Sequence, residues 1–540
     1  MVKLFLILLL ATVLRLYLLG SLPAGFHRDE AFLGYNAYSI LKTGRDMNGD
    51  FLPLHLRSFI NSPAGYSYLA IPPVAMFGLN EFSVRLPSAV FGIATILVTY
   101  FLVFELFKSY RLALISSFLL AISPWHINLS RTAIENVVVV FLITVGCLLF
   151  LRKRFILAFM SFSISMLLYQ APRAFLPFFV PLLIFLGAKS HIRTNIVRFL
   201  IFIILPIAFI LASPALSLRL RTVGIPASGN VQLTAEEAIR EDGVRGIKPI
   251  FSRIFHNKPL GFAGQFLENY FSHFSYAFLF TDKGLPERYR IPGAPLIYLI
   301  ELPLLIIGAV TLINKRSWES KLLLGWILIA PVGSSLAFDD VPNLQRTLLA
   351  FPALSIIAAI GLEKILKFRN FVTISYCVSL IAFLHAYYIH LPVHRTLYRH
   401  EGYKELVAQV QKRKNQFTSF VITNRETAPT VFFLFYNKYD PAKFIAETRE
   451  LPGDDRDRTS FDNYVFTTEE CPIRLVKKDG IQTITGSPGT LYANFGTCED
   501  VPGAITLSTV KRGDSSAVFK LVIIDEQRKM QEDRPESKSF

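Results

Sequence analysis

Apolar segments about as long as a membrane is thick recur along this chain, and they constrain its fold more than any other feature. A transmembrane helix needs roughly 20 consecutive apolar residues. The chain of 540 residues is 52% hydrophobic, with a mean hydropathy of +0.43. Because soluble globular domains lack this pattern, we predict a mainly α, polytopic membrane protein. The eleven predicted spans are 4–20, 86–107, 111–125, 133–151, 155–170, 173–188, 199–214, 293–313, 321–337, 346–363 and 371–388.

Basic residues indicate how these spans are oriented. Lys and Arg concentrate in alternate short loops, such as 152–154, which marks those loops as cytoplasmic. The net charge of +16 therefore reflects loops that face anionic lipid, and nucleic acid is not expected as a partner. The first segment is interpreted as an uncleaved span with a cytoplasmic N-terminus, and a signal peptide is the alternative. An odd number of spans in the plasma membrane then places the C-terminus outside the cytoplasm.

Three long segments fall on the non-cytoplasmic side, and the last of them changes character. The first, 21–85, should contain a short interfacial helix over 31–42 that stops at Gly44. The second, 215–292, should hold a loop followed by an interfacial helix. The third is polar and begins near residue 390. We therefore predict a transmembrane domain of residues 1–390, a small extracytoplasmic α/β domain of residues 391–526 and a disordered tail of residues 527–540.

The α/β assignment rests on a helix over about 401–414 and on short β-type runs separated by turn signals. Cys471 and Cys498 both lie in this domain, so a disulfide between them is expected in an oxidising compartment. Cys147 and Cys377 fall within spans and are expected to be inert packing residues. The β-type runs are 420–423, 431–434, 464–466, 491–495 and 517–524.

Two adjacent carboxylates, Asp29 and Glu30, lie shortly after the first span. Acidic groups near hydrocarbon are costly unless water, partner groups or a function keep them there. One interpretation makes Asp29 a helix N-cap with Glu30 in the first turn. The other makes the pair part of an active site with a rigidly held general base. Glu135, followed by Asn136 near the outer end of the fourth span, is the candidate second active-site carboxylate, and a helical ion pair with Arg131 is its structural alternative.

Four arginines lie at the outer ends of spans, against the cytoplasmic bias of the other basic residues. Each alone could be a snorkelling side chain or an ion-pair partner. Together they predict an anion site at the outer leaflet, because a guanidinium binds phosphate through two parallel hydrogen bonds. A lipid phosphate is the expected ligand. The four are Arg85, Arg131, Arg173 and Arg346, whereas Arg15 inside the first span is expected to be snorkelling or structural.

No cofactor is firmly implied. The ten histidines are scattered and do not form a ligand cluster with Cys or carboxylates. Asp339 and Asp340 could bind a cation, which leaves a divalent metal ion open, and a solvated loop pair is the alternative. No Gly-rich phosphate loop is present in the sequence, so ATP or a nucleotide sugar is not predicted as a substrate.

The ordered set of motifs resembles the GT-C glycosyltransferases that use polyprenyl-phosphate sugars. Within that class the likeness is to bacterial relatives of the protein O-mannosyltransferases and of the lipid A aminoarabinose transferase, and it covers about residues 1–410. The resemblance implies that the transmembrane domain is catalytic and that Asp29 is the base, with Glu30 beside it. In these relatives an Asp often stands near the start of the fourth span, where this chain has Glu135 and Asn136. The matching stretches are 26–31, 78–88, 123–131, 169–173, Arg346 with Pro352, and 401–405.

The chemistry implied by the resemblance agrees with these residue types. A polyprenyl phosphate is a good leaving group, so the enzyme needs cations that stabilise the departing phosphate and a carboxylate that activates the acceptor. We predict an integral-membrane inverting glycosyltransferase that moves a sugar from a polyprenyl-phosphate donor to an extracytoplasmic protein, lipid or glycan. A transporter or lipid flippase is the main alternative, although its ionisable groups would usually lie near the bilayer midplane. A third possible function is that of a membrane-anchored binding module, with the outer domain as its functional part.

Overall fold

The chain forms two compact units in the computed structural model, which describes residues 2–58, 62–188, 191–212, 224–453, 455–478 and 481–524. The chain passes from one unit to the other between Tyr388 and Ile389, close to the predicted boundary at residue 390. The first outer loop, however, which the sequence analysis placed in the transmembrane domain, belongs mostly with the C-terminal region. The predicted tail 527–540 lies outside the described residues. The helical unit comprises Met1–Leu19, Ile60–Tyr66 and Arg85–Tyr388, and the mixed unit comprises Gly20–Phe59, Ser67–Val84 and Ile389–Phe540.

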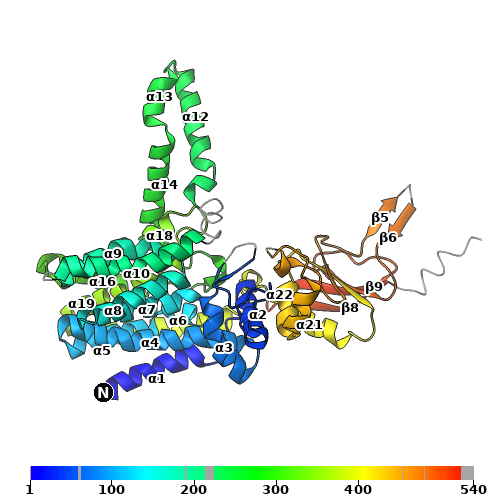
Figure 1. The fold of residues 1–540 in the computed structure, drawn as a ribbon, viewed down its shortest axis with the longest axis horizontal. Coiled ribbons are helices and arrows are strands. Elements are labelled where there is room, and N and C mark those ends of the chain that lie inside the picture. Colours follow the sequence, from blue (N-terminus) through cyan, green and yellow to red (C-terminus); the bar gives the residue numbers. More distant parts are fainter. Residues whose placement is uncertain are drawn as a thin grey trace, which may run out of the picture. The chain divides into compact units, whose positions relative to one another are not determined.

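Each predicted span overlaps at least one helix of the helical unit, although several bounds differ, as for 293–313, where α16 begins only at Glu301 (Figure 1). Among the described helices, four segments are long and apolar enough to cross a membrane, and a fifth qualifies if α5 and α6, bent by 60°, count as one span. The predicted fold class is thereby confirmed. The main helices are α1 (Val2–Leu16), α4 (Glu81–Phe107), α5 (Tyr110–Ile122), α6 (Pro124–Ser130), α7 (Glu135–Leu151), α8 (Phe155–Leu168), α9 (Ala171–Gly187), α10 (Ile192–Ala212), α16 (Glu301–Lys315), α17 (Trp318–Ile329), α18 (Val332–Ser335), α19 (Phe351–Lys364) and α20 (Arg369–His385), with short turns η4 (Arg346–Ala350), η5 (Leu366–Phe368) and η6 (Ala386–His390).

Glycines bring two of these helices into backbone contact. A Cβ atom added to Gly308 of α16 would lie 2.1 Å from the carbonyl oxygen of Ile357, and one added to Gly361 of α19 would lie 1.9 Å from that of Leu304. Only glycine fits at either position. Close packing through small residues is typical of helix pairs in membranes, where lipid is as apolar as the helices and close contact is the source of their association.

The second predicted outer region contains more helix than expected. Its described residues form α12, α13 and α14, and α12 lies beside α13 and α14 in a hairpin (Figure 1). α14 also contacts α18. Residues 213–223, where the expected loop begins, lie outside the described part of the chain. The elements here are η2 (Ile225–Ala227), α12 (Asn230–Val244), α13 (Pro249–Phe255), α14 (Lys258–Ser272), α15 (Tyr276–Phe280) and η3 (Glu287–Tyr289).

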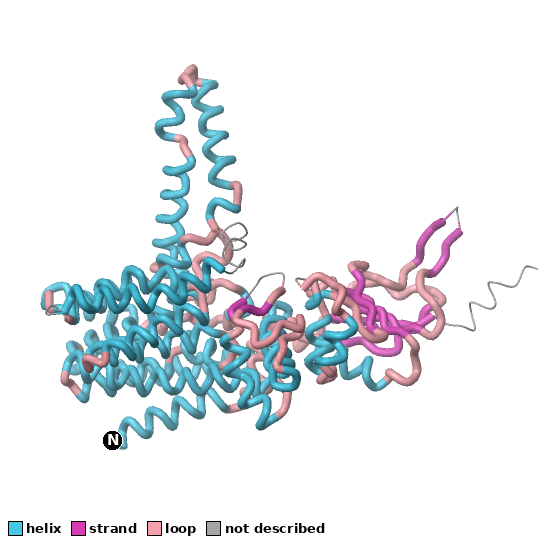
Figure 2. The backbone as a smooth tube through the Cα atoms, viewed as in Figure 1, coloured by secondary structure: helices cyan, strands magenta, loops and turns pink. Residues whose placement is uncertain are grey.

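The mixed unit contains a five-stranded sheet with the order β4-β3-β7-β9-β8, whose strands are magenta in Figure 2. β3 pairs in parallel with β4 and β7, whereas β9 pairs antiparallel with β7 and β8. Four of the predicted runs are strands of this sheet. The strands are β3 (Ser419–Thr423), β4 (Tyr464–Thr467), β7 (Thr490–Phe495), β8 (Ala504–Lys511) and β9 (Ala517–Ile524), with a separate hairpin of β5 (Leu475–Lys478) and β6 (Ile481–Ile484), and with the short β1 (His55–Leu56) and β2 (Ser62–Pro63) earlier in the chain.

The fifth run, 431–434, was wrongly predicted as a strand. It lies in helix α22, whose residues from Thr430 to Phe435 are all buried. An uninterrupted apolar run fits a buried helix as well as a buried strand, so periodicity does not separate the two. The helices of this unit are α2 (Arg28–Thr43), α3 (Gly65–Phe77), which begins in the helical unit, η7 (Thr396–Arg399), α21 (Tyr403–Lys412), α22 (Thr430–Tyr436), α23 (Pro441–Glu447) and η8 (Arg456–Arg458).

Helix α2 carries the acidic pair and packs on α22 and α23. It ends at Gly44, which has φ of 69° as a left-handed C-cap, as predicted. Gly34 allows the close approach of α22, because a Cβ atom there would lie 2.8 Å from the ring of Phe435. The first outer loop is therefore held by the C-terminal region, more than 350 residues away in sequence.

Candidate active site

Asp29 lies in the first turn of α2, but it is not the N-cap. The cap is His27, whose side chain accepts a hydrogen bond from the Asp29 backbone N–H, and whose own backbone N–H donates to Glu30. The interpretation of Asp29 as a cap is thus wrong, because α2 begins three residues earlier than predicted. The Asp29 side chain is 59% exposed, with Oδ2 at 3.3 Å from His27 Nδ1. This carboxylate is therefore accessible while its backbone is fixed by the capping box.

Glu30, in contrast, is buried and paired. Its Oε2 accepts a hydrogen bond from Arg399 Nη2 at 2.5 Å, and the two side chains are 1% and 3% exposed. Arg399 also donates from Nε to the carbonyl oxygen of Ala24 at 3.2 Å. The carboxylate of Glu30 thus connects the start of α2 to η7. Since it is shielded from solvent, Glu30 is suited to hold Asp29 in position.

A second set of contacts fixes the residue before Asp29. The Arg28 side chain forms an ion pair with the buried Asp457. The backbone N–H of Arg28 donates to His400 Nδ1 at 3.2 Å, and the His400 ring stacks near that of His27 at 4.6 Å between centroids. Burial raises the pKa of Asp457, and the Arg28 charge opposes this rise. The first turn of α2 is consequently braced by side chains from η7 and η8.

In the helical unit, Arg85 and Arg131 converge on the C-terminal end of α1. Arg85 donates from Nη1 to the carbonyl oxygen of Leu19 at 3.2 Å. Arg131 donates to the carbonyl oxygens of Leu14 and Tyr17 at 3.0 and 2.7 Å, and to Tyr387 Oη at 3.0 Å. Both arginines are almost completely buried. A cation is favourable beside the exposed carbonyls of a helix C-terminus, which gives both residues a structural role.

Arg15 is buried as well, and it does not snorkel. Its guanidinium donates to the carbonyl oxygen of Ala121 at 3.0 Å and lies 2.8 Å from His126 Nδ1. These contacts support the expected structural role of Arg15.

Arg346 opens η4, where a chain of hydrogen bonds holds its backbone. Its side chain, 17% exposed, lies 3.2 Å from Asp339 Oδ1. Its backbone N–H donates to Asn343 Oδ1 at 2.7 Å. The Asn343 N–H in turn donates to His273 Nε2 at 3.2 Å. Burial, with a smaller effect of the Arg346 charge, lowers the pKa of His273 to about 4, so this ring is neutral and can accept that hydrogen bond.

Asn136 connects the start of α7 to the same segment. Two buried hydrogen bonds join Asn136 to Gln345: Asn136 Nδ2 donates to the main-chain carbonyl oxygen of Gln345 at 3.0 Å, and Gln345 Nε2 donates to Asn136 Oδ1 at 2.9 Å. Arg173 lies in the first turn of α9 and donates from Nε to the Met166 carbonyl oxygen at 2.9 Å. α18 contacts both α9 and η4, so Arg173 and Arg346 belong to elements that share α18 as a neighbour.

Glu135 is the first residue of α7. Arg131 follows the last residue of α6, so the two are not one turn apart on a single helix, as the sequence suggested. The proposed helical pair fails because the chain leaves the helical conformation between them. Asp339, considered as a cation ligand, lies against Arg346. Within the described ranges, no group of three or more His, Cys, Asp or Glu side chains is arranged to hold a metal ion.

The carboxylates Asp29 and Glu30 thus lie in the mixed unit, and the four arginines with Glu135 lie in the helical unit. Sequence reasoning missed the residues that position the acidic pair and Arg346. Local patterns contain no signal for contacts between residues several hundred positions apart. The missed residues are Arg399, His400, Asp457, Asn343 and Gln345.

Comparison with known proteins adds a match to a family model over part of the chain and a similar fold. Residues 61–217 match the family model described as dolichyl-phosphate-mannose-protein mannosyltransferase. The crystal structure of ArnT from Cupriavidus metallidurans in the apo state is similar over 96% of this chain and 97% of that chain, at 12% identity and a TM-score of 0.52. The same values hold for ArnT from this organism bound to undecaprenyl phosphate.

A further similar structure is that of the Archaeoglobus fulgidus oligosaccharyltransferase in complex with Zn and sulfate. The match covers 80% of this chain but only 61% of that chain, at 14% identity and a TM-score of 0.48. Among curated protein sequences, no match to this chain is found.

The family match and the ArnT-like fold confirm the predicted resemblance to GT-C glycosyltransferases. The matched segment 61–217 contains Arg85, Arg131, Glu135 and Arg173.

Proposed function

We propose that this chain is an integral-membrane inverting glycosyltransferase that moves a sugar from a polyprenyl-phosphate donor to an acceptor outside the cytoplasm. The mannosyltransferase family match and the ArnT-like fold support this activity. The ArnT structure with undecaprenyl phosphate makes an undecaprenyl-phosphate sugar the first donor to test.

The accessible carboxylate of Asp29 is the observation that carries the proposal. A general base must be open to its substrate and fixed in direction. Asp29 is 59% exposed, whereas Glu30 beside it is fully buried. In the reaction, Asp29 takes the proton of the acceptor hydroxyl or amine while that atom bonds to the anomeric carbon. The bond from this carbon to the phosphate oxygen breaks, and the polyprenyl phosphate leaves. Glu30 acts as a positioning residue through its ion pair with Arg399.

Among the arginines, Arg173 and Arg346 are the proposed donor-phosphate ligands. Arg85 and Arg131 donate hydrogen bonds to carbonyl oxygens at the end of α1 and are almost completely buried. Arg346, in contrast, is partly exposed. A guanidinium stabilises the negative charge that develops on a departing phosphate. Glu135, partly buried at the start of α7, stays a candidate for orienting the acceptor.

The decisive experiment is Asp29→Asn in the purified full-length protein, assayed for transfer from an undecaprenyl-phosphate sugar. We expect the rate to fall by about two to four orders of magnitude, the range for loss of a general base. Asp440→Asn is the matched control, because Asp440 is an exposed acid at the start of another helix of the same unit, α23. Near-normal transfer by Asp29→Asn, or an equal loss in both variants, would refute the assignment.

The proposed orientation places the N-terminus in the cytoplasm and the mixed unit outside it. The basic loops between spans support this orientation. Reporter fusions after Ile389 or Leu391 should report an external location. A cytoplasmic signal at these positions would contradict both the orientation and an extracytoplasmic acceptor.

A further inference from the structure

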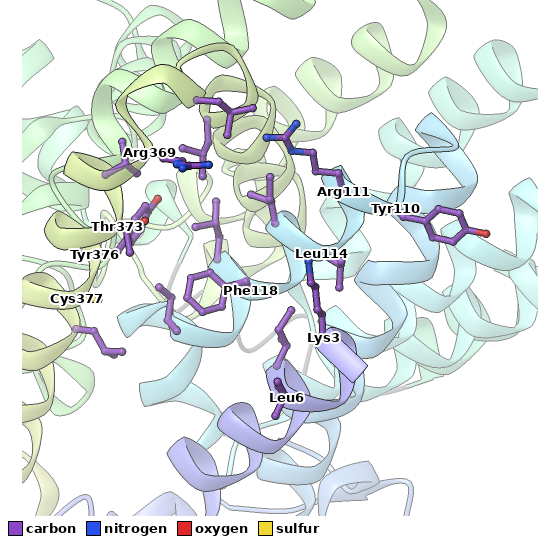
Figure 3. A pocket seen from close by; sticks show the side chains of 18 residues that line it. Lys3, Leu6, Tyr110, Arg111, Leu114, Phe118, Arg369, Thr373, Tyr376 and Cys377 are labelled. Carbon is purple, nitrogen blue, oxygen red and sulfur yellow. The ribbon is translucent and has the colours of Figure 1, made fainter. Parts of the chain in front are cut away.

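A cavity of about 820 Å³ opens between α1, α5 and α20 of the helical unit (Figure 3). None of the candidate catalytic or phosphate-binding residues lines it. Its volume falls within the range of about 300–1,000 Å³ that is typical of ligand sites. Most of its walls are apolar side chains, including Leu114, Phe118 and Leu380.

Each of the three helices contributes one cation from its first turn. These are Lys3 of α1, Arg111 of α5 and Arg369 of α20. In Figure 3 the guanidinium groups of Arg111 and Arg369 lie on the same side of the cavity. No acidic residue is among the side chains that line it. The cavity therefore combines an apolar interior with a concentration of positive charge.

The dimensions of the apolar wall match one leaflet of a bilayer. α5 lines the cavity from Arg111 to Ile122, and α20 lines it from Arg369 to Leu380. At a rise of 1.5 Å per residue, each wall extends about 17 Å from its cation. Half of the hydrocarbon core of a membrane is about 15 Å thick. A lipid whose phosphate lies at these cations would thus find an apolar wall for the full depth of its acyl chains.

We propose that this cavity binds an anionic glycerophospholipid of the cytoplasmic leaflet. The phosphate lies among Lys3, Arg111 and Arg369, and the acyl chains follow α5 and α20. A zwitterionic lipid fits less well, because its ammonium group would meet the same three cations. The leaflet rests on the proposed orientation, in which these three residues are cytoplasmic. The site is separate from the proposed sugar transfer, whose donor phosphate lies at the opposite face.

The test uses native mass spectrometry of the full-length protein in detergent, with phosphatidylglycerol and phosphatidylcholine as probes. We expect tighter binding of phosphatidylglycerol. The variant Arg111→Gln/Arg369→Gln should bind it about fivefold more weakly for each cation removed. Arg193→Gln/Lys321→Gln is the matched control, since both residues are exposed cations of the same predicted face and neither lines the cavity. This control should leave the affinity unchanged.

A native thiol reports the position of the bound lipid. Cys377 lines the cavity and is an exposed free cysteine, so the expectation that it is a packing residue was wrong, whereas Cys147 is buried as expected. Phosphatidylglycerol should slow the reaction of Cys377 with N-ethylmaleimide, and phosphatidylcholine should not. Equal affinity for the two lipids, no effect of the double substitution, an equal loss in the control, or unprotected Cys377 would each overturn the proposal. Protection of Cys377 by undecaprenyl phosphate but not by phosphatidylglycerol would also overturn it. None of these readouts depends on sugar transfer.

Discussion

Arg399 and Glu30 form a nearly solvent-free ion pair, with Nη2 and Oε2 separated by 2.5 Å and side chains 3% and 1% exposed. The two residues are 369 positions apart. Each charge depends on the other, because an isolated charge in such an environment would be strongly destabilising. The pair therefore makes the first turn of α2 and η7 parts of one structure.

We expect Glu30→Gln and Arg399→Met each to destabilise the mixed unit by about 3–5 kcal/mol, because each leaves one buried charge without its partner. The double variant should lose less stability than the sum of the losses in the two single variants. Chemical unfolding of the purified protein measures these values. Arg425→Gln is the control, since Arg425 forms an exposed ion pair with Glu470 in the same unit and its loss should cost less than about 1 kcal/mol. A similar small effect in all variants would contradict the coupling.

Arg346 and Arg131 should respond differently to the same change. Arg346→Gln should keep the fold and lower kcat/KM for the donor by about 10- to 100-fold, as expected for the loss of a hydrogen bond to a charged group. Arg131→Gln should instead lower the melting temperature, because it removes the buried contacts to Leu14, Tyr17 and Tyr387. Melting curves and donor titrations separate the two effects. A folded Arg346→Gln protein with an unchanged donor dependence would exclude Arg346 as a phosphate ligand.

Asp46 should make stability depend on pH. Burial raises the pKa of its carboxyl from 3.8 to about 6, with hydrogen bonds from Asp50 and Asn48 opposing the rise. Between these pH values the folded chain binds more protons than the unfolded chain, so stability falls as pH rises from about 4 to about 6 and then levels off. The total change is about 2–3 kcal/mol. Asp46→Asn should remove this dependence.

Melting temperatures from pH 4 to 7.5 provide the measurement. Asp50→Asn is a suitable control, because the Asp50 side chain is 39% exposed and pairs with Arg57. It should retain most of the dependence. If the melting temperatures of wild-type protein and Asp46→Asn change with pH in parallel, Asp46 is not the source of the pH dependence.

The predicted disulfide is present in the structure. Cys471 and Cys498 are bonded, with Cα atoms 5.8 Å apart and a sequence separation of 27. In the chain-entropy description, a loop of this size contributes about 3.5 kcal/mol to stability. Reductant should therefore lower the melting temperature of the wild-type protein, but not that of Cys471→Ser/Cys498→Ser. If reductant lowers both melting temperatures equally, the disulfide is not the cause of the change.

The sequence predicted features that depend on neighbouring residues. Apolar runs located most helices of the helical unit, Gly44 ended α2, and short β-type runs between turn signals located four strands. Prediction failed where one local pattern fits both a helix and a strand: the apolar run 431–434 was predicted as a strand but lies in helix α22. His27 was not recognised as a cap, because Ser, Thr, Asp and Asn are the usual caps.

The candidate site was predicted by residue type more than by arrangement. Asp29 and Glu30 were chosen together, yet one is exposed and the other buried. Arg85 and Arg131 were grouped with Arg346 because all lie at span ends, although their guanidinium groups bind carbonyls at the end of α1. These differences arise from contacts between distant segments, which spacing along the chain does not encode.

The contact between Arg28 and Asp457 has a consequence for how the protein is made. The two residues are separated by 429 positions. At a synthesis rate of roughly 5–20 residues per second, the first outer loop waits roughly 20 to 90 seconds for the segment that braces it. During that time helix α2 lacks α22, α23 and η8. A ribosome that stalls before α22 is made therefore leaves α2 without α22, α23 and η8, and the first outer loop reaches its native contacts only late in translation.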